Sequence, residues 1–362
     1  MDSVRLIKPY VDYISVVEDF QRVFESGVFT QGPYAKQFAK NLSSYVGAKH
    51  TFLTTSATTA LSVCLKVLSI RPGDEVAISD FSFPATANVV EDLGARPVFV
   101  DVNPSTFNMC VDDLLSKLTS KTKAVIFVDS FGNPTGQHDV KEVCEQHSLP
   151  LIEDAACAIG SLYNGNRCGN LSDLTCFSFH PRKLLCTGEG GAITTNNDEW
   201  AGWLDAKLAH GARKLSTGSL DFSSYGFNYR MSELQAVMGL TQLENLNEII
   251  LHRQRIRDLY SKFLTPLGFR QQAVSKNCSH NVQSIVFKVP DHVNRDQLIE
   301  QLKKKEIETT IGTYCQSDLP YYKAKYQSVQ KNAVFLQNNT ITLPCFQDVP
   351  WKMVCEQIKR LI

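Results

Sequence analysis

Short β-branched runs alternate with stretches of helical periodicity between residues 50 and 195, and this alternation limits the fold more than any other feature of the sequence. It is typical of βαβ units, so we expect an α/β fold with a mostly parallel sheet and ligand chemistry at the carboxyl ends of its strands. The seven predicted strands are 51–55, 75–79, 97–100, 124–128, 150–153, 174–179 and 192–195. The predicted helices between them are 58–68, 85–93, 111–118 and 140–147, each long enough to cross from one strand to the next.

The rest of the chain predicts a smaller second domain. Residues 231–251 carry apolar side chains at steps of three to five residues, which predicts one long amphipathic helix. A strand at 284–289 and a helix at 295–304 follow, and the remaining C-terminal residues show no regular repeat. We expect a large domain over 1–250 and a small α+β domain over 251–362, packed closely because no Pro- or Gly-rich linker separates them.

The charge balance argues against nucleic acid and membranes as partners. The 37 Lys and Arg residues offset 37 Asp and Glu residues, so no overall field attracts polyanions. No run approaches the roughly 18 apolar residues of a spanning helix, and the start lacks the basic-then-apolar order of a signal peptide, so we expect a cytoplasmic protein. The 11 cysteines contain no Cys-x-x-Cys pair, so we expect no metal site and interpret most of them as small buried side chains.

The strongest chemical signal is a lysine and an aspartate that follow two predicted strands. Lys183 lies in SFHPRK, before TGEGGA, and Asp154 ends LIED, 29 residues earlier. A lysine amine and a carboxylate that share one flat ligand suit pyridoxal 5′-phosphate (PLP), because the amine bonds to the aldehyde and the carboxylate keeps the pyridine nitrogen protonated. Taken singly, Asp154 could be a turn or helix cap and Lys183 a solvated surface residue.

Two further segments suit other parts of this cofactor. The run TTSATTAL at 54–61 lies between a strand and a helix, where free amides and the helix dipole bind phosphate. Ala57 and Thr58 are the candidate amide donors, with the Thr58 hydroxyl as another. In DFSFP, Phe83 is the candidate aromatic wall for the ring and Phe81 the alternative. A Ser/Thr run is also a common N-cap, and either Phe could belong to the core.

Six segments in this order resemble the DegT/DnrJ/EryC1/StrS family of PLP-dependent nucleotide-sugar aminotransferases. The resemblance covers nearly the whole chain, although the C-terminal part matches only in outline. It implies the fold of aspartate aminotransferase (PLP-dependent fold type I), a three-layer sandwich around a seven-stranded sheet. It also implies amino transfer from L-glutamate to a keto sugar carried on a nucleotide, in amino-sugar, surface-glycan or secondary-metabolite biosynthesis. The segments are TTSATTAL, DFSFPATANVV, ARPVFVDVNPSTFNM, LIEDAACAIGSLYNGNRCG, SFHPRKLLCTGEGGAITTN and YGFNYRMSELQAVMGLTQLE.

The resemblance also assigns roles to single residues. It implies that Lys183 bonds to the cofactor and that Asp154 is the partner of the pyridine nitrogen. It adds Ser178 as a phosphate ligand and Asn228 as a residue that reaches the phosphate across a dimer interface, so we expect a homodimer with shared active sites. Cys157 stands where many members carry Gln or His near the ring hydroxyl, and because a thiol is a weak donor the cofactor spectrum could differ.

Other interpretations stay open. A related PLP enzyme could be a sugar dehydratase or a cyclitol aminotransferase, and a regulatory protein could keep the fold without turnover. The dehydratase branch of the family carries His in place of the cofactor-bonded lysine, so Lys183 argues against it. Once released, Lys183 is also expected to act as the general base and acid at the substrate carbon. His180 and Arg182 flank it and receive no role.

Overall fold

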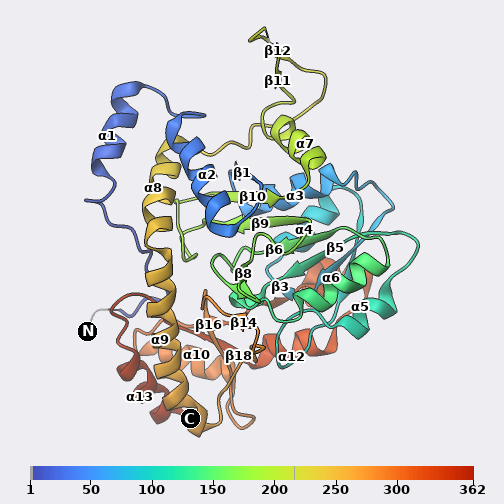
Figure 1. The fold of residues 1–362 in the computed structure, drawn as a ribbon. Coiled ribbons are helices and arrows are strands. Elements are labelled where there is room, and N and C mark those ends of the chain that lie inside the picture. Colours follow the sequence, from blue (N-terminus) through green and yellow to red (C-terminus); the bar gives the residue numbers. More distant parts are fainter. Residues whose placement is uncertain (1–2, 216) are drawn as a thin grey trace.

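The central sheet of the computed structural model, which describes residues 3–215 and 217–362, has seven strands (Figure 1). They are β1 (His50–Thr54), β2 (Glu75–Ser79), β4 (Arg96–Val100), β5 (Thr122–Val128), β6 (Leu151–Asp154), β9 (Leu174–Ser178) and β10 (Gly191–Thr195). Their order is β1-β10-β9-β6-β5-β2-β4, and β10 alone runs antiparallel to the other six strands. The predicted α/β fold and mostly parallel seven-stranded sheet are confirmed.

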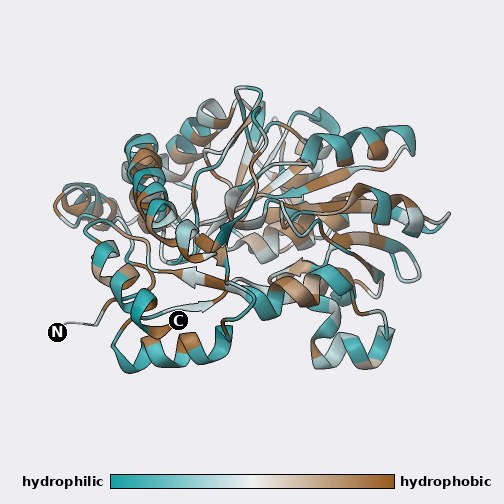
Figure 2. Ribbon diagram, turned by 90° about the horizontal axis from the view of Figure 1, so that it is seen from below, coloured by the Kyte–Doolittle hydropathy of each residue, from teal (hydrophilic) through white to brown (hydrophobic). Residues whose placement is uncertain are grey.

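Alternate residues along each strand pack against different layers of helices, which produces the three-layer arrangement. Ile126 of β5 packs in the core beneath one helical layer, and its neighbour Phe127 packs in the core of the other. Figure 2 shows hydrophobic residues on the central strands and hydrophilic residues on the outer faces of the helices. One layer contains α3 (Ala57–Val67), α4 (Ala85–Asp92) and α7 (Asp198–Leu208), and the other contains α2 (Pro33–Val46), α5 (Val111–Lys117), α6 (Gln137–Gln146) and α8 (Glu233–Glu244).

The C-terminal part has its own antiparallel sheet and core. Its strands, in the order β13-β15-β18-β16, are β13 (Arg270–Gln271), β15 (Ile285–Lys288), β18 (Thr340–Leu343) and β16 (Thr310–Ile311). They pack with α9 (Leu246–Leu264), α10 (Arg295–Lys304) and α13 (Trp351–Leu361) around Tyr260, Phe287 and Ile341. The strand predicted at 284–289 is β15, and the helix predicted at 295–304 coincides with α10.

The prediction of a single helix at 231–251 is wrong, because two helices occupy this region. α8 ends at Glu244, and α9 begins after Asn245 and continues to Leu264. The Asn245 side chain donates to the Thr241 carbonyl at 3.1 Å, a bond that competes with the helical ladder where the helix breaks. α9 runs from the core of the large sheet into the C-terminal core, so the boundary expected at residue 250 falls inside one continuous helix.

Several further elements were not predicted. α1 (Val17–Ser26) and α2 precede the sheet, and α11 (Pro320–Tyr326) and α12 (Lys331–Asn339) lie near the C-terminus. No helix within 3–215 or 217–362 combines the length and the apolar character needed to span a membrane. The remaining strands are β3 (Phe81–Ser82), β7 (Leu162–Tyr163), β8 (Asn166–Arg167), β11 (Arg213–Lys214), β12 (Leu220–Asp221), β14 (Cys278–Ser279) and β17 (Tyr314–Cys315).

Candidate active site

Ser178 and the start of α3 lie on either side of Gly191, at the carboxyl edge of the large sheet. Gly191 pairs with Thr54 of β1 and with Ser178 of β9. A Cβ atom at Gly191 would meet the carbonyl carbon of Ser56 at 2.5 Å and the amide nitrogen of Ala57 at 2.7 Å. Any side chain here would push the helix away from the strand. The pairing of the strands therefore brings the predicted phosphate ligands Ser178 and Ala57 close together.

The cap of α3 leaves two amides free for an anion. The Ser56 hydroxyl accepts from the Thr59 amide at 3.1 Å, and the Thr59 hydroxyl accepts from the Ser56 amide at 3.1 Å. The amides of Ala57 and Thr58, in the first turn, have no acceptor within the helix. They lie at the positive end of the helix dipole, beside Ser178, so the geometry suits a phosphate group.

Asp154 ends β6 with a buried carboxylate. Its Oδ2 accepts from the Thr86 hydroxyl of α4 at 3.0 Å, and its Oδ1 accepts from the Ala156 amide at 3.2 Å. Burial raises the pKa of Asp154, while these two hydrogen bonds and the charge of Lys183 act in the opposite direction. A positively charged partner at this carboxylate would keep it ionised.

Lys183 lies in the loop after β9, within electrostatic reach of Asp154. Its ammonium group is half-buried and donates to the Sγ atom of Cys157 at 3.1 Å. The Lys183 amide donates to the His180 carbonyl at 2.8 Å, which closes a tight turn before the side chain. The fold thus brings together the amine and the carboxylate that follow two different strands, and it adds a thiol beside the amine.

A C-terminal segment at 280–283 holds the loops that carry Lys183 and Cys157. The Asn281 side chain donates to the Cys157 and Ile159 carbonyls, both at 2.9 Å. The Gln283 side chain donates to the Arg182 carbonyl at 2.6 Å and accepts from the Leu184 amide at 2.9 Å, so it binds the backbone on both sides of Lys183. Sequence reasoning missed both residues, since their partners lie 99 to 124 positions away.

Phe83 and Phe81 have different surroundings. The Phe83 side chain is 65% exposed and meets the Tyr314 ring edge-on, with the ring centroids 6.3 Å apart. Phe81 is 0% exposed and packs edge-on against Phe107 and Phe131 in the core. Phe81 therefore cannot face a cofactor, and Phe83 is the accessible ring of the two.

Together these groups fit PLP. The free amides of α3 and the Ser178 hydroxyl offer donors to a phosphate, and Gly191 leaves room where a Cβ atom would fill the cradle. The buried Asp154 carboxylate offers an acceptor to a protonated ring nitrogen, and Lys183 offers an amine to an aldehyde. The arrangement is suited to carbon–nitrogen bond chemistry with a protonated ring as electron sink.

The sequence model of the DegT/DnrJ/EryC1/StrS aminotransferase family matches residues 15–360. The chain belongs to this aminotransferase family. GDP-perosamine synthase of Caulobacter vibrioides is 36% identical over 282 residues, covering 77% of this chain and 76% of that protein. The UDP-2-acetamido-2-deoxy-3-oxo-D-glucuronate aminotransferase of Pseudomonas aeruginosa is 34% identical over 292 residues, covering 80% and 79%. The PLP form of the sugar aminotransferase Spr1654 from Streptococcus pneumoniae aligns with a TM-score of 0.93 at 25% identity, covering 99% of this chain and 98% of that one.

The last of the predicted site residues of this aminotransferase is Asn228. It is exposed, and its backbone forms a bridge with Ala209. It follows β11 and β12, which Figure 1 shows projecting beyond α7. Within the described chain, no hydrogen bond links the Asn228 side chain to Ser178 or to the start of α3.

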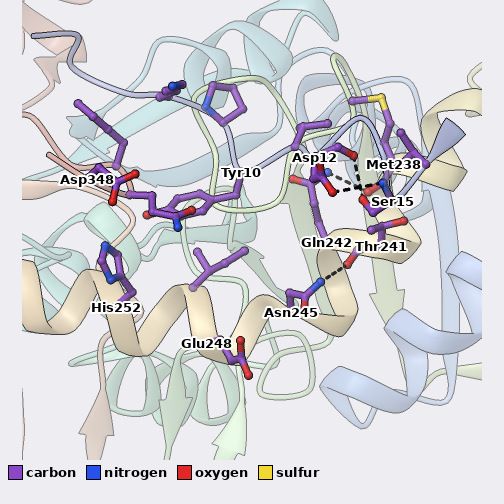
Figure 3. A pocket seen from close by; sticks show the side chains of 17 residues that line it. Tyr10, Asp12, Ser15, Met238, Thr241, Gln242, Asn245, Glu248, His252 and Asp348 are labelled. Atoms are coloured by element: carbon purple, nitrogen blue, oxygen red, sulfur yellow. Dashed lines mark hydrogen bonds between the residues drawn. The ribbon is translucent and has the colours of Figure 1, made fainter.

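A separate cavity of about 530 Å³ lies between the N-terminal segment and the junction of α8 and α9 (Figure 3). Tyr10 lines one side, and Gln242 and His252 line the other. The predicted site residues do not line this cavity. Gln242 connects it with the loop that carries Lys183, because its side chain accepts from the Cys186 amide at 2.9 Å, three residues after Lys183.

Proposed function

We propose that this aminotransferase uses PLP to move an amino group from L-glutamate to a keto sugar carried on a nucleotide, in the biosynthesis of amino sugars for surface glycans or secondary metabolites. The observation that carries the proposal is that the charge of Lys183 acts on the buried Asp154 carboxylate, while Ser178 and the start of α3 lie on either side of Gly191. The names of two relatives, a GDP-perosamine synthase and a UDP-sugar aminotransferase, support a nucleotide-linked sugar as substrate.

Each site residue has a distinct task in this proposal. The amides of Ala57 and Thr58 and the Ser178 hydroxyl bind the phosphate, which anchors the cofactor through charge-assisted hydrogen bonds. Asp154 keeps the ring nitrogen protonated, and Phe83 covers one face of the ring. When bound, PLP supplies an electron sink for the charge that develops at the substrate carbon.

Lys183 has two tasks. Its amine holds the cofactor covalently, and once released it removes and returns the proton at the reacting carbon. The Cys157 thiol at 3.1 Å and the turn closed by the His180 carbonyl restrict where the amine can point. Gln283 holds the backbone on both sides of the lysine, so the amine stays near its partners through both halves of the reaction.

A homodimer with shared sites is part of the proposal, in which Asn228 of one subunit reaches the phosphate bound by the other. The projecting segment before Asn228 supports this, because it exposes several large apolar side chains that a partner would cover. Among them are Leu215, Leu220, Phe222 and Tyr225. A Lys183→Ala subunit mixed with an Asn228→Asp subunit should recover about a quarter of wild-type activity, since random mixing gives one intact site in half of the dimers. A fully active monomer would refute the proposal that the two subunits share their active sites.

The central test is the site of attachment. After loading with PLP and reduction with borohydride, digestion and mass spectrometry should find the cofactor on Lys183, and Lys183→Ala should carry none. Wild-type enzyme with glutamate and a panel of nucleotide-linked keto sugars should then form an amino sugar and 2-oxoglutarate. Amination of inososes instead would identify a cyclitol aminotransferase, and loss of water without amination a dehydratase. An adduct on another residue, or none, would refute the proposal.

A further inference from the structure

Two acidic residues lie buried behind the active site and have no task in the proposed reaction. Glu153 precedes Asp154 on β6, so its side chain points to the opposite face of the sheet. Asp129 follows the neighbouring strand β5. Both side chains are 0% exposed, and oxygen atoms of the two carboxyl groups lie within 4.8 Å of one another and of the Cys168 sulfur.

The hydrogen bonds around this pair are incomplete. Glu153 Oε2 accepts from the Thr175 hydroxyl at 2.8 Å and from the Gly169 amide at 3.2 Å. Glu153 Oε1 and both carboxyl oxygens of Asp129 have no partner among the described residues. None of the ion pairs between described residues involves Asp129 or Glu153. Two bare carboxylates in this position would be desolvated and would repel each other.

A single proton on one of the two carboxyl groups removes this repulsion. The Glu153 carboxylate already has two donors, so it is the better site for the negative charge. Asp129 lacks other donors, and as a carboxylic acid it can donate to the free Oε1 of Glu153. Burial and the charge of Glu153 both raise the pKa of Asp129 well above its usual value. The other titratable groups that face Asp129 are Asp154, Cys157 and Cys168, and none of them is a cation.

We infer that Asp129 and Glu153 share one proton at neutral pH, and that this bond joins the ends of β5 and β6 and positions Asp154. The backbone supports the second part, because Val128 pairs with Asp154 and the Asp129 amide donates to the Asp154 carbonyl at 3.2 Å. A bond between the side chains of Asp129 and Glu153 holds the same two strand ends from behind. Asp129 and Glu153 are therefore positioning residues, and this role toward Asp154 rests on the proposed function.

The first test needs no cofactor. Infrared spectra of the apoprotein at pH 8 should show the carbonyl stretch of one protonated carboxyl group, which Asp129→Asn removes and which the exposed-site control Asp112→Asn leaves in place. The absence of this band in the wild type, or its survival in Asp129→Asn, would overturn the inference. Stoichiometric metal in the purified wild type that disappears in Asp129→Asn would also overturn it, in favour of a bound cation.

The second test separates positioning from stability. Asp129→Asn keeps a donor to Glu153 and should unfold like the wild type, whereas Asp129→Ala should raise the unfolding equilibrium constant roughly 10- to 100-fold by leaving Oε1 of Glu153 without a donor. Val140→Ala, in the same core, serves as a destabilised control.

In PLP-loaded enzyme, Asp129→Ala should shift the pH midpoint of the cofactor absorbance, and Asp129→Asn should restore it. A shift of equal size in Val140→Ala would show a merely structural role. If Lys183 carries no cofactor but the infrared band is present, the proposed function fails and the shared proton stands.

Discussion

The two faces of β6 handle neighbouring acids in opposite ways. Asp154 faces the active site, where a hydroxyl, an amide and the charge of Lys183 favour its ionised form. Glu153 faces the interior, where its neighbour is another acid, and burial raises the pKa of Glu153 as it does that of Asp154. The difference teaches that a buried carboxylate is supported by donors and a cation at the edge that binds ligand, and by a proton shared with a second acid one residue away. Substitutions at the edge should cost activity, and substitutions behind it should cost stability.

The largest expected effect comes from Asp154→Asn. In the proposed function this change removes the charged partner of the ring nitrogen, and the loss of one member of a buried ion pair costs about 3–5 kcal/mol, or roughly 10²- to 10⁴-fold in kcat/KM. The apoprotein of this variant should be as stable in urea as the wild type, or more stable, because a buried charge disappears. Glu153→Gln is the matched control on the same strand and should keep activity within about 10-fold, since its amide can donate to Asp129. Equal losses in both variants would break the comparison of the two faces.

A smaller effect is expected at His280, an interior base. Its Nε2 atom lies 2.8 Å from the Phe131 carbonyl, and burial lowers its pKa from 6.5 to about 4. The unfolded chain therefore binds a proton between these pH values that the folded chain does not, so stability is complete above the unfolded pKa and is lost as pH falls. From pH 7.5 to pH 5 this loss is about 2 kcal/mol.

The variant His280→Gln isolates this contribution. The introduced glutamine amide can donate to the same carbonyl but does not titrate. Between pH 7.5 and pH 5, the free energy of unfolding in urea should therefore fall by about 2 kcal/mol less in the variant than in the wild type. For His147→Gln, at an exposed position, the free energy of unfolding should fall by as much as in the wild type. Identical pH dependence in all three proteins would show that His280 is not the group responsible.

The smallest expected effect is at Phe83, an edge residue without charge. Phe83→Ala should weaken PLP binding about 3- to 10-fold, the value of one aromatic contact, with little change in stability. Phe24→Ala is the control, because Phe24 on α1 is exposed to nearly the same extent, 64%, and also packs edge-on against another ring. Fluorescence titration with PLP measures both. Equal weakening in the two variants would exclude a specific role for Phe83.

Local patterns were sufficient for the large sheet and insufficient for the C-terminal part. The seven strands and the four helices between them were predicted because each strand is a β-branched run and each helix a periodic one, and these signals are short-range. The break at Asn245 was missed, because a side chain that competes with the helix backbone leaves the apolar stripe unchanged. The short strands of the C-terminal sheet depend on partners elsewhere in the chain.

The residues of the candidate site also divide into those that the sequence predicts and those that it does not. Lys183, Asp154 and the start of α3 could be proposed from the sequence, because each lies at or after the end of a strand and parallel strands end at one edge, whereas Ser178 came from the family resemblance alone. The groups that hold them could not be proposed, because Gln283 and Asn281 belong to no motif and bind backbone groups 99 to 124 residues away. The same holds for Asp129, which meets Glu153 only when β5 and β6 pair.

The amino-acid order alone determined the α/β class, the succession of strands and the residue types with the chemistry for an amino-transfer site, since these depend on side-chain periodicity and on the residues just after each strand. Tertiary structure alone decided which groups surround each acid. Asp154 and Glu153 are adjacent in the chain and similar in chemistry. They differ because alternate side chains of a strand enter different surroundings, and the free energy of a buried charge depends on the groups that surround it.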